Sequence, residues 1–163
     1  MLSKLVPRSC LRSCLPRANF TTTTDALNLA HLEYDDFGKF LALEDGDKAL
    51  VIKVYDGDTL TVGFRHGSSQ KPVRESIRIR GIDTPELRTK SEEEKRLALL
   101  ARSRLQEVTL REVVTVVSPE TDKYGRILCD LATERGIKSI SEYMLQAPEL
   151  CRRYDGGTRQ PWI

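Results

Sequence analysis

Short runs of alternating apolar and polar residues most constrain how this chain can fold. Three such runs follow one another from Ala49 onward: "ALVIKVY" at 49–55, "TLTVGF" at 59–64 and "SIRIRGI" at 76–82. Each is rich in β-branched residues and is bounded by Gly, Ser, Pro or Asp, which is the pattern of a β-strand between turns. The "DGD" between the first two runs is a strong hairpin signal. The sequence therefore predicts three successive strands, the first two joined as a hairpin.

A helical pattern then interrupts the strands. Between residues 91 and 112 the apolar positions repeat every three or four residues and share one stripe, at Leu97, Ala101, Leu105 and Val108. Ser91 and Glu94 have the spacing of a capping box, and the acidic first turn suits the helix dipole. We predict an amphipathic helix over this segment.

Two more strands and a second helix follow. "EVVTVVS" at 112–118 and "RILCDLAT" at 126–133 have strand patterns and are separated by the turn "DKYGR", while "SISEYMLQ" at 139–146 predicts a short helix ended by Pro148. This order matches an α+β domain built on a five-stranded OB-fold Greek-key β-barrel with two or three helices. The rim loops of such a barrel can contact nucleic acid.

The N-terminal residues differ in composition from the rest of the chain. Residues 1–24 contain four basic side chains and no acid, with many Ser and Thr, which is typical of an organelle transit peptide and favours import into mitochondria. A basic tail of a protein in another organelle or the cytoplasm is the alternative. We expect residues 25–46 to form an extension and residues 47–163 to form the folded domain.

No pattern indicates a membrane span or a zinc site. Uncharged apolar runs fall well short of the roughly 18 residues that cross a bilayer. Cys10 and Cys14 lie in the predicted transit peptide, no CxxC pair occurs, and the two histidines are isolated. Cys129 lies in a strand pattern, so we interpret it as a small core residue.

Polar clusters occur at three strand ends: residues 56–59, 83–86 and 122–126. Each cluster alone is ordinary for a turn. Together they offer oxygen ligands for a hard cation such as Ca²⁺, which Asp58, Asp83 and the backbone carbonyl of Thr84 would supply with water. Glu86 would then remain available as a base.

Two arginines would complete a phosphodiesterase site. A guanidinium can stabilise the negative charge that develops on phosphate oxygens during hydrolysis. Arg126 closes the "DKYGR" turn, and either Arg78 or Arg80 could serve on the strand before Asp83. Because Arg78 and Arg80 share one face of a regular strand, alternation alone does not choose between them.

Three of these stretches resemble one family in combination. "YDGDTLTV", "IRIRGIDTPE" and "TDKYGRILCDL" occur in the order of the staphylococcal nuclease, or thermonuclease-like, family, and the resemblance covers residues 48–162. It implies an OB-fold nuclease that uses calcium to cleave DNA and RNA, leaving 3′-phosphate ends. We expect a monomer that acts on DNA and/or RNA as single strands, away from membranes.

The resemblance also assigns roles to individual residues. It implies calcium ligands at Asp58, Asp83 and the Thr84 carbonyl. Glu86 matches the general base, and Arg78, rather than Arg80, matches the first phosphate-binding arginine. Arg126 matches the second.

The resemblance weakens toward the end of the sequence. Pro148 interrupts the region where the family continues its second helix, and we see no counterpart of the family's longer C-terminal helix. Tyr124 and Tyr154 are nevertheless candidates for contact with the nucleotide. The alternative function is a non-catalytic binding module of the Tudor staphylococcal nuclease type, whose signature would be loss of the site's acids or arginines. That signature is missing here.

Overall fold

A computed structural model of the protein describes residues 43–66, 71–122 and 124–162. The predicted transit peptide, 1–24, and most of the predicted extension, 25–46, lie outside the described residues. The elements are, in chain order, β1 (Lys48–Val54), β2 (Thr59–His66), β3 (Lys71–Ile79), β4 (Ile82–Asp83), α2 (Glu92–Thr109), β5 (Val113–Thr121), β6 (Ile127–Thr133), α3 (Ile140–Leu145) and β7 (Arg152–Arg153).

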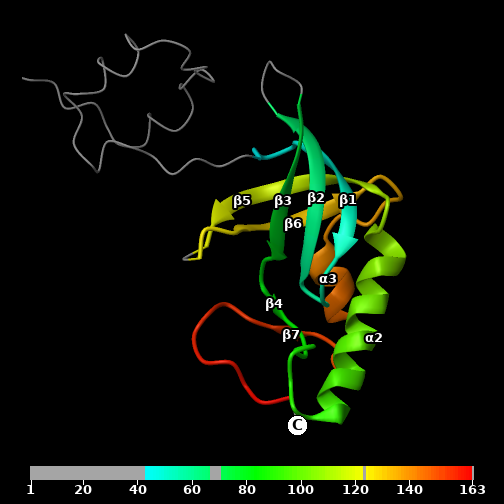
Figure 1. The fold of residues 1–163 in the computed structure, drawn as a ribbon, viewed down its shortest axis with the longest axis vertical. Helices are drawn as coiled ribbons and strands as arrows, with labels where there is room; N and C mark the ends of the chain where they lie inside the picture. The colour runs from blue at the N-terminus through cyan, green and yellow to red at the C-terminus, as the bar shows by residue number, and fades with distance from the viewer. Residues whose placement is uncertain (1–42, 67–70, 123, 163) are drawn as a thin grey trace, which may run out of the picture. The chain divides into compact units, whose positions relative to one another are not determined.

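Within the described residues, five strands close into a barrel in the order β1-β2-β3-β6-β5 (Figure 1). The pairs β1–β2, β2–β3, β5–β6 and β1–β5 are antiparallel, and β3 pairs with β6 in parallel. With two helices in the described part of the chain, this architecture confirms the predicted α+β fold on a five-stranded barrel. Each predicted strand is present, although β3 begins five residues earlier than the pattern indicated, at Lys71.

Alternation along the strands builds the barrel core. In β6, Ile127, Cys129 and Leu131 are buried while the residues between them are partly exposed, so the predicted core position of Cys129 is confirmed. Leu43 is also buried in this core, and Gly46 N donates a hydrogen bond to Val116 O at 2.9 Å. The packed region therefore includes Leu43, which precedes the predicted start of the domain by four residues.

Helix α2 lies beside β1 and α3 in Figure 1. Its buried residues are Ala98, Ala101, Leu105 and Thr109, while Leu97 and Val108 pack partly against the core. The predicted apolar stripe of this helix therefore lies on the face that packs against the core. The helix ends at Thr109, three residues before the predicted end, because the cap residue Leu110 is extended and Arg111 has a positive φ of 67°.

Helix α3 ends before Pro148, as the sequence indicated. The chain then turns back, and β7 pairs antiparallel with β4 (Figure 1). We call residues 152–162 the C-terminal segment; these residues contain no helix. No helix in the described part of the chain is long and apolar enough to cross a bilayer.

Candidate active site

Arg78 links the first two polar clusters. The pairing of Thr59 with Arg78 across β2 and β3 places Arg78 beside Asp58, which immediately precedes β2. Arg78 Nη1 forms an ion pair with Asp58 Oδ2, and its Nη2 lies 3.7 Å from Asp83 Oδ1. Nη2 also donates to Ile82 O at 3.0 Å. All three charged side chains are buried, so the fold brings Asp58 and Asp83 together around one guanidinium.

Arg80 lies elsewhere. Its Nη2 donates to the carbonyl of Ser118 and to Leu128 O at 3.3 Å, and it pairs with Glu120 at 3.3 Å. Arg80 therefore joins β3 to β5 and β6 on the outside of the acidic cluster. The contacts with Asp58 and Asp83 belong to Arg78, the choice that the family resemblance implied.

Asp56 is a third acid in the same buried region, and the sequence interpretation gave it no role. Burial, and then the charge of Asp58, raise the pKa of Asp56 to about 6. Burial also raises the pKa of Asp83; Arg159 opposes this rise, Asp58 adds to it, and Arg78 opposes it. Carboxylates held this close and this dry favour a bound cation.

The cluster fits a hard cation. Asp56 Oδ1 and Asp83 Oδ1 are buried and accept no hydrogen bond from the described residues. Among those residues, no three His, Cys, Asp or Glu side chains group as a metal site, so a site here needs backbone or water oxygens besides Asp58 and Asp83. That composition suits Ca²⁺, which accepts carboxylate, carbonyl and water ligands. Thr84, the expected carbonyl ligand, is buried beside them.

Gly57 allows the first two clusters to approach. A Cβ at this position would lie 2.7 Å from Ala101 Cβ and 2.9 Å from Thr84 Cβ. Contacts that short are not tolerated, so only glycine lets the loop before Asp58 pack against Thr84 and α2. The sequence interpretation attributed the "DGD" glycine to turn conformation, but the structure shows that close packing requires it.

Glu86, the predicted base, is anchored to the start of α2. Its backbone N donates to Glu94 Oε1 at 3.3 Å, and Glu94 Oε2 accepts from Thr89 Oγ1 at 2.6 Å. Ser91 Oγ accepts from Glu94 N at 3.2 Å, as the capping box predicts. The second hydrogen bond of a capping box, from Ser91 N to the Glu94 carboxylate, is not formed. Ser91 N donates instead to Thr89 Oγ1 at 3.2 Å, because the Glu94 carboxylate accepts from the backbone N of Glu86.

Arg126 is positioned by Asp122. Asp122 Oδ2 accepts from Arg126 Nε at 2.8 Å, and Oδ1 accepts from the backbone N of Tyr124 and of Arg126 at 2.8 and 2.9 Å. Burial raises the pKa of Asp122, but these hydrogen bonds outweigh that effect and lower it overall. Sequence reasoning saw Asp122 only as a turn residue; its Asx-type position in "DKYGR" was the available signal.

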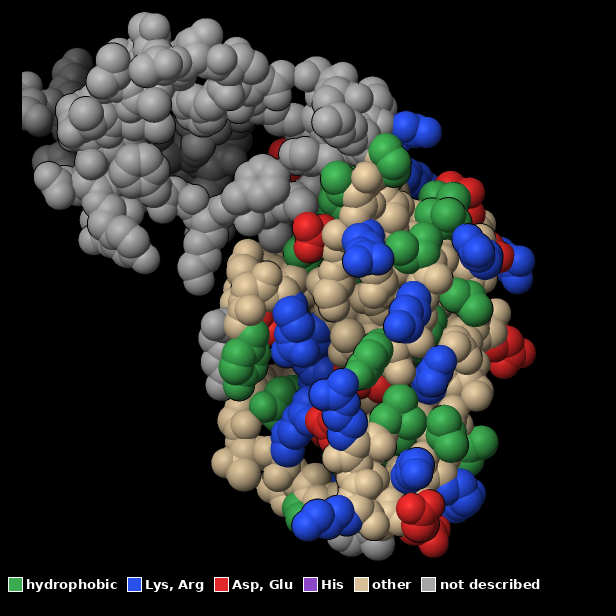
Figure 2. All heavy atoms as spheres, in the orientation of Figure 1, with side chains coloured by type: hydrophobic (Ala, Val, Ile, Leu, Met, Phe, Trp, Pro, Cys, Tyr) green, Lys and Arg blue, Asp and Glu red, His purple; other side chains and the backbone are tan. Residues whose placement is uncertain are grey.

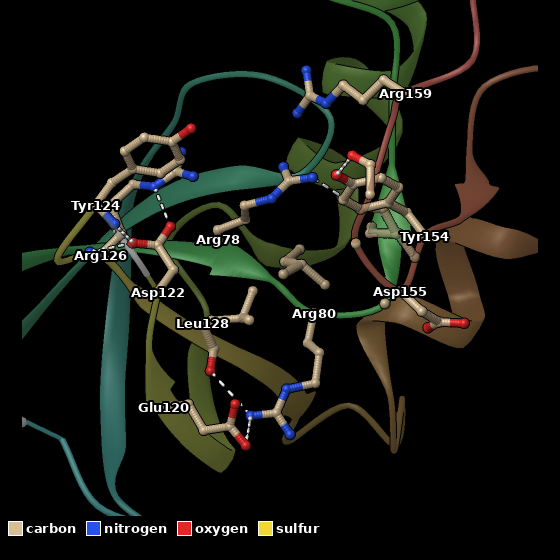
Figure 3. A pocket seen from close by; sticks show the side chains of 15 residues that line it. Arg78, Arg80, Glu120, Asp122, Tyr124, Arg126, Leu128, Tyr154, Asp155 and Arg159 are labelled. Atoms are coloured by element: carbon tan, nitrogen blue, oxygen red, sulfur yellow. Dashed lines mark hydrogen bonds and ion pairs between the residues drawn. The ribbon is translucent and has the colours of Figure 1, made fainter.

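The arginines and tyrosines meet at one cavity of about 940 Å³ (Figure 3). Its walls include Arg78, Arg126, Tyr124 and Tyr154, so four sequence-predicted residues share one space. Arg159, which sequence reasoning missed, also lines the cavity. Arg159 forms an ion pair with Glu86 and thereby connects the predicted base to this space.

Comparison with known proteins supports the relationship suggested by these motifs. Residues 76–148 match the family model described as staphylococcal nuclease homologue. A comparison with curated proteins finds no match to the chain. The matched stretch contains Arg78, Asp83, Glu86 and Arg126, whereas Asp58 lies before it. Together with the five-stranded barrel, this match over residues 76–148 supports a staphylococcal nuclease-like fold for the chain.

Proposed function

We propose that this protein is a calcium-dependent endonuclease that hydrolyses phosphodiester bonds of DNA and/or RNA and leaves 3′-phosphate ends. The observation that carries the proposal is the buried Asp58–Arg78–Asp83 cluster, which adjoins a cavity lined by Arg126. A module that only binds nucleic acid has no need for such closely placed buried acids, whose ionised forms are costly to bury.

Asp58, Asp83 and the Thr84 carbonyl are the residues that would hold Ca²⁺. When bound there, the ion would supply positive charge to the scissile phosphate and to the attacking water. Asp56 interacts with Asp58, and its raised pKa follows from burial and from that neighbour. We infer that Asp56 supports the ligand set rather than the reacting phosphate.

Glu86 is suited to accept the proton of the attacking water. Its side chain is 49% exposed, so water can reach it. Arg159 forms ion pairs with both Glu86 and the buried acid Asp83, which places the two acids close to each other. A positioned carboxylate acting as general base contributes about 10²–10⁴-fold to a rate. Glu94 fixes the backbone of Glu86 and thus limits where this base can point.

Arg78 and Arg126 differ in exposure to solvent, and we infer different roles for them. Arg78 is buried, with only 9% of its side chain exposed, so it holds Asp58 and Asp83 together and adds positive charge beside them. The side chain of Arg126 is 37% exposed, with Nε held by Asp122. Its guanidinium can thus meet the phosphate from the cavity wall and stabilise the charge of the transition state.

Aromatic side chains support single-stranded substrates. Tyr124 is 72% exposed and lines the cavity together with Tyr154. The guanidinium carbon of Arg126 lies 5.5 Å from the centre of the Tyr124 ring. A base unstacked from its neighbours can stack on such a ring, whereas a base within a duplex cannot. We therefore infer a preference for single-stranded DNA or RNA.

The decisive experiment is a cleavage assay with the full chain. End-labelled single-stranded DNA and RNA are incubated with Ca²⁺ or with EDTA, using wild type, Glu86→Gln and the matched control Glu149→Gln, whose side chain is exposed away from the cavity. We expect cleavage with Ca²⁺ only, unchanged in the control and reduced about 100-fold or more in Glu86→Gln. Products should gain a free 3′ hydroxyl on phosphatase treatment. Cleavage that survives both EDTA and Glu86→Gln contradicts the proposal.

We also infer import into mitochondria from the acid-free, basic composition of residues 1–24. Sequencing the N-terminus of the mature protein isolated from cells tests this inference. A mature protein that retains residues 1–24 in the cytoplasm contradicts it.

A further inference from the structure

The C-terminal segment lies directly against the acidic cluster. Its first residues pair with β4, so that Arg152 is opposite Asp83 and Arg153 is opposite Ile82. Tyr154 N extends this pairing by donating to Gly81 O at 2.9 Å. The segment begins after the stretch that matches the family model, which ends at residue 148.

Arg159 places its guanidinium on two residues of the proposed site. Its Nη1 forms an ion pair with Glu86 Oε1, and its Nε lies 3.0 Å from Asp83 Oδ1. Trp162 Nε1 donates to the other oxygen, Asp83 Oδ2, at 3.4 Å. Both oxygens of the predicted metal ligand and one oxygen of the predicted base therefore contact the C-terminal segment.

These contacts differ from those that hold the segment together. Arg152 lies over the ring of Trp162 at 3.9 Å and donates to Pro161 O at 2.9 Å, and Tyr154 Oη donates to Gly157 O at 2.8 Å. Arg159, by contrast, is 42% exposed, and Asp83 Oδ1 accepts no hydrogen bond despite its nearness. Arg159 can thus leave the acids without disturbing the barrel core.

A guanidinium and a metal ion have the same requirement here. Each needs the oxygens of Asp83, and two cations on one carboxylate repel each other. In this structure the positive charge beside Asp83 and Glu86 comes from Arg159. A bound divalent cation would supply the positive charge at Asp83 in its place. While it is paired with Arg159, Glu86 also has one oxygen occupied and is a poorer acceptor for the proton of water.

We propose that Arg159 is a further residue of this site: an internal cation that competes with the divalent metal ion for Asp83 and restrains Glu86 until the metal binds. The proposal rests on the metal site of the proposed function. Linkage makes the competition reciprocal, so metal binding weakens the hold of Arg159, and removing Arg159 strengthens metal binding by the same factor.

The first test measures calcium binding alone, by calorimetry on the full chain without nucleic acid. Arg159→Gln removes the charge, Arg159→Lys keeps it, and Arg153→Gln is the matched control, since Arg153 belongs to the same segment but pairs with the exposed Glu142 at 3.2 Å. We expect Arg159→Gln to bind calcium about tenfold more tightly, within the usual range of coupling between sites. Arg159→Lys and Arg153→Gln should stay near wild type.

The second test uses Trp162, the one tryptophan in the sequence. Release of Arg159 frees the neighbouring contact of Trp162 with Asp83, so calcium should shift the fluorescence of wild type to longer wavelength. In Arg159→Gln the midpoint of this shift should move to lower calcium concentration. Thermal unfolding of each variant confirms that the comparison is between folded proteins.

Calcium affinity that is unchanged or weaker in Arg159→Gln overturns the competition, as does equal tightening in Arg153→Gln or an absence of calcium binding in both wild type and Arg159→Gln. Unchanged or weaker affinity in Arg159→Gln, or equal tightening in Arg153→Gln, leaves the proposed function standing, whereas an absence of calcium binding in both proteins also contradicts its calcium dependence. That function fails if the cleavage assay shows no activity with calcium, whereas the competition is measured without substrate. If calcium affinity does not depend on Arg159, the proposed nuclease activity stands and only the competition between Arg159 and calcium is excluded.

Discussion

At the scale of single residues, Arg126 combines exposure with a fixed orientation. Its Nε is held 2.8 Å from Asp122 Oδ2, while its side chain remains 37% exposed to the cavity. Because the Arg126 side chain is more than a third exposed, solvent screens this partly buried ion pair, which contributes only about 1 kcal/mol or less to folding. A donor aimed at developing charge contributes far more to the transition state, with losses of about 10²–10³-fold when one is removed.

Arg126→Ala should therefore lower kcat about 100-fold while the melting temperature changes little. Asp122→Asn keeps an oxygen for the turn but removes the charge that orients Arg126, so we expect a smaller loss of kcat. Steady-state kinetics and thermal unfolding on the same preparations measure both effects. Parallel losses of rate and stability in Arg126→Ala would identify a structural arginine instead.

Cys129 and Cys151 should be chemically inert in the folded protein. Burial is the main cause that raises the pKa of each thiol to about 12, from an ordinary value of 9.0. Because the thiolate is the reactive form, iodoacetamide at about pH 8 should label both peptides only after denaturation. Mass spectrometry of native and denatured samples measures this labelling. Rapid labelling of either cysteine in the native state contradicts the burial.

The same thiol shifts have a consequence for stability. The unfolded chain loses these protons at lower pH than the folded chain does, so folding is favoured fully below about pH 9 and progressively less as pH rises toward about 12. Urea unfolding across this pH range would show the decline.

At the scale of elements, the position of Asp58 depends on how closely its loop packs against α2. Gly57 lies between Thr84 and Ala101, with no room for a side chain. This contact couples the β1–β2 loop, the β4 loop and the helix. Any change that separates them should move Asp58 relative to Asp83.

Gly57→Ala should destabilise the protein by about 1–3 kcal/mol, the usual cost of overpacking, and should also weaken calcium binding. Gly63→Ala is the control, because its added Cβ would meet Ile52 Cγ2 at 3.4 Å, an ordinary contact. Urea unfolding and calcium calorimetry test the two variants. Normal calcium affinity in a destabilised Gly57→Ala would show that the loop tolerates the shift.

At the scale of the whole molecule, basic and acidic residues nearly balance, so positive charge is concentrated in a few places rather than spread over the surface. The sequence carries 26 basic and 24 acidic residues, so subtracting the four basic residues of positions 1–24 leaves 22 basic against 24 acidic. Figure 2 shows several Lys and Arg side chains close together around acidic groups on one face. Nucleic acid should therefore be held by a few arginines rather than by a broad basic surface.

Binding of single-stranded DNA should weaken only modestly with salt. Three phosphate contacts predict a slope of about −2 for log affinity against log salt concentration. Fluorescence anisotropy with Glu86→Gln, which should bind without cleaving, measures the slope. A magnitude of about 6 or more would require many phosphate contacts that the described surface does not suggest.

Much of the fold and part of the site could be predicted from the sequence, because the signals are local. Alternation along β6 and the stripe of α2 follow from the periods of strand and helix, and they place Cys129 and Leu105 in the core. Asp58, Asp83, Glu86 and Arg126 lie in short motifs whose order is visible without a structure. The role of each stays a prediction until activity and metal binding are measured.

Tertiary structure alone decided which groups meet. Strand alternation places Arg78 and Arg80 on the same face. Only the packing at the end of β3 shows that Arg78 pairs with Asp58 while Arg80 pairs with Glu120. Arg159 lies in a segment without periodicity and reaches Asp83 because β7 pairs with β4, a contact that no local pattern encodes. The sequence by itself determined the barrel and its acids, since both depend on local periodicity and motif. Long-range pairing determined the electrostatic partners of those acids, because the energy of a charge depends on its neighbours in space.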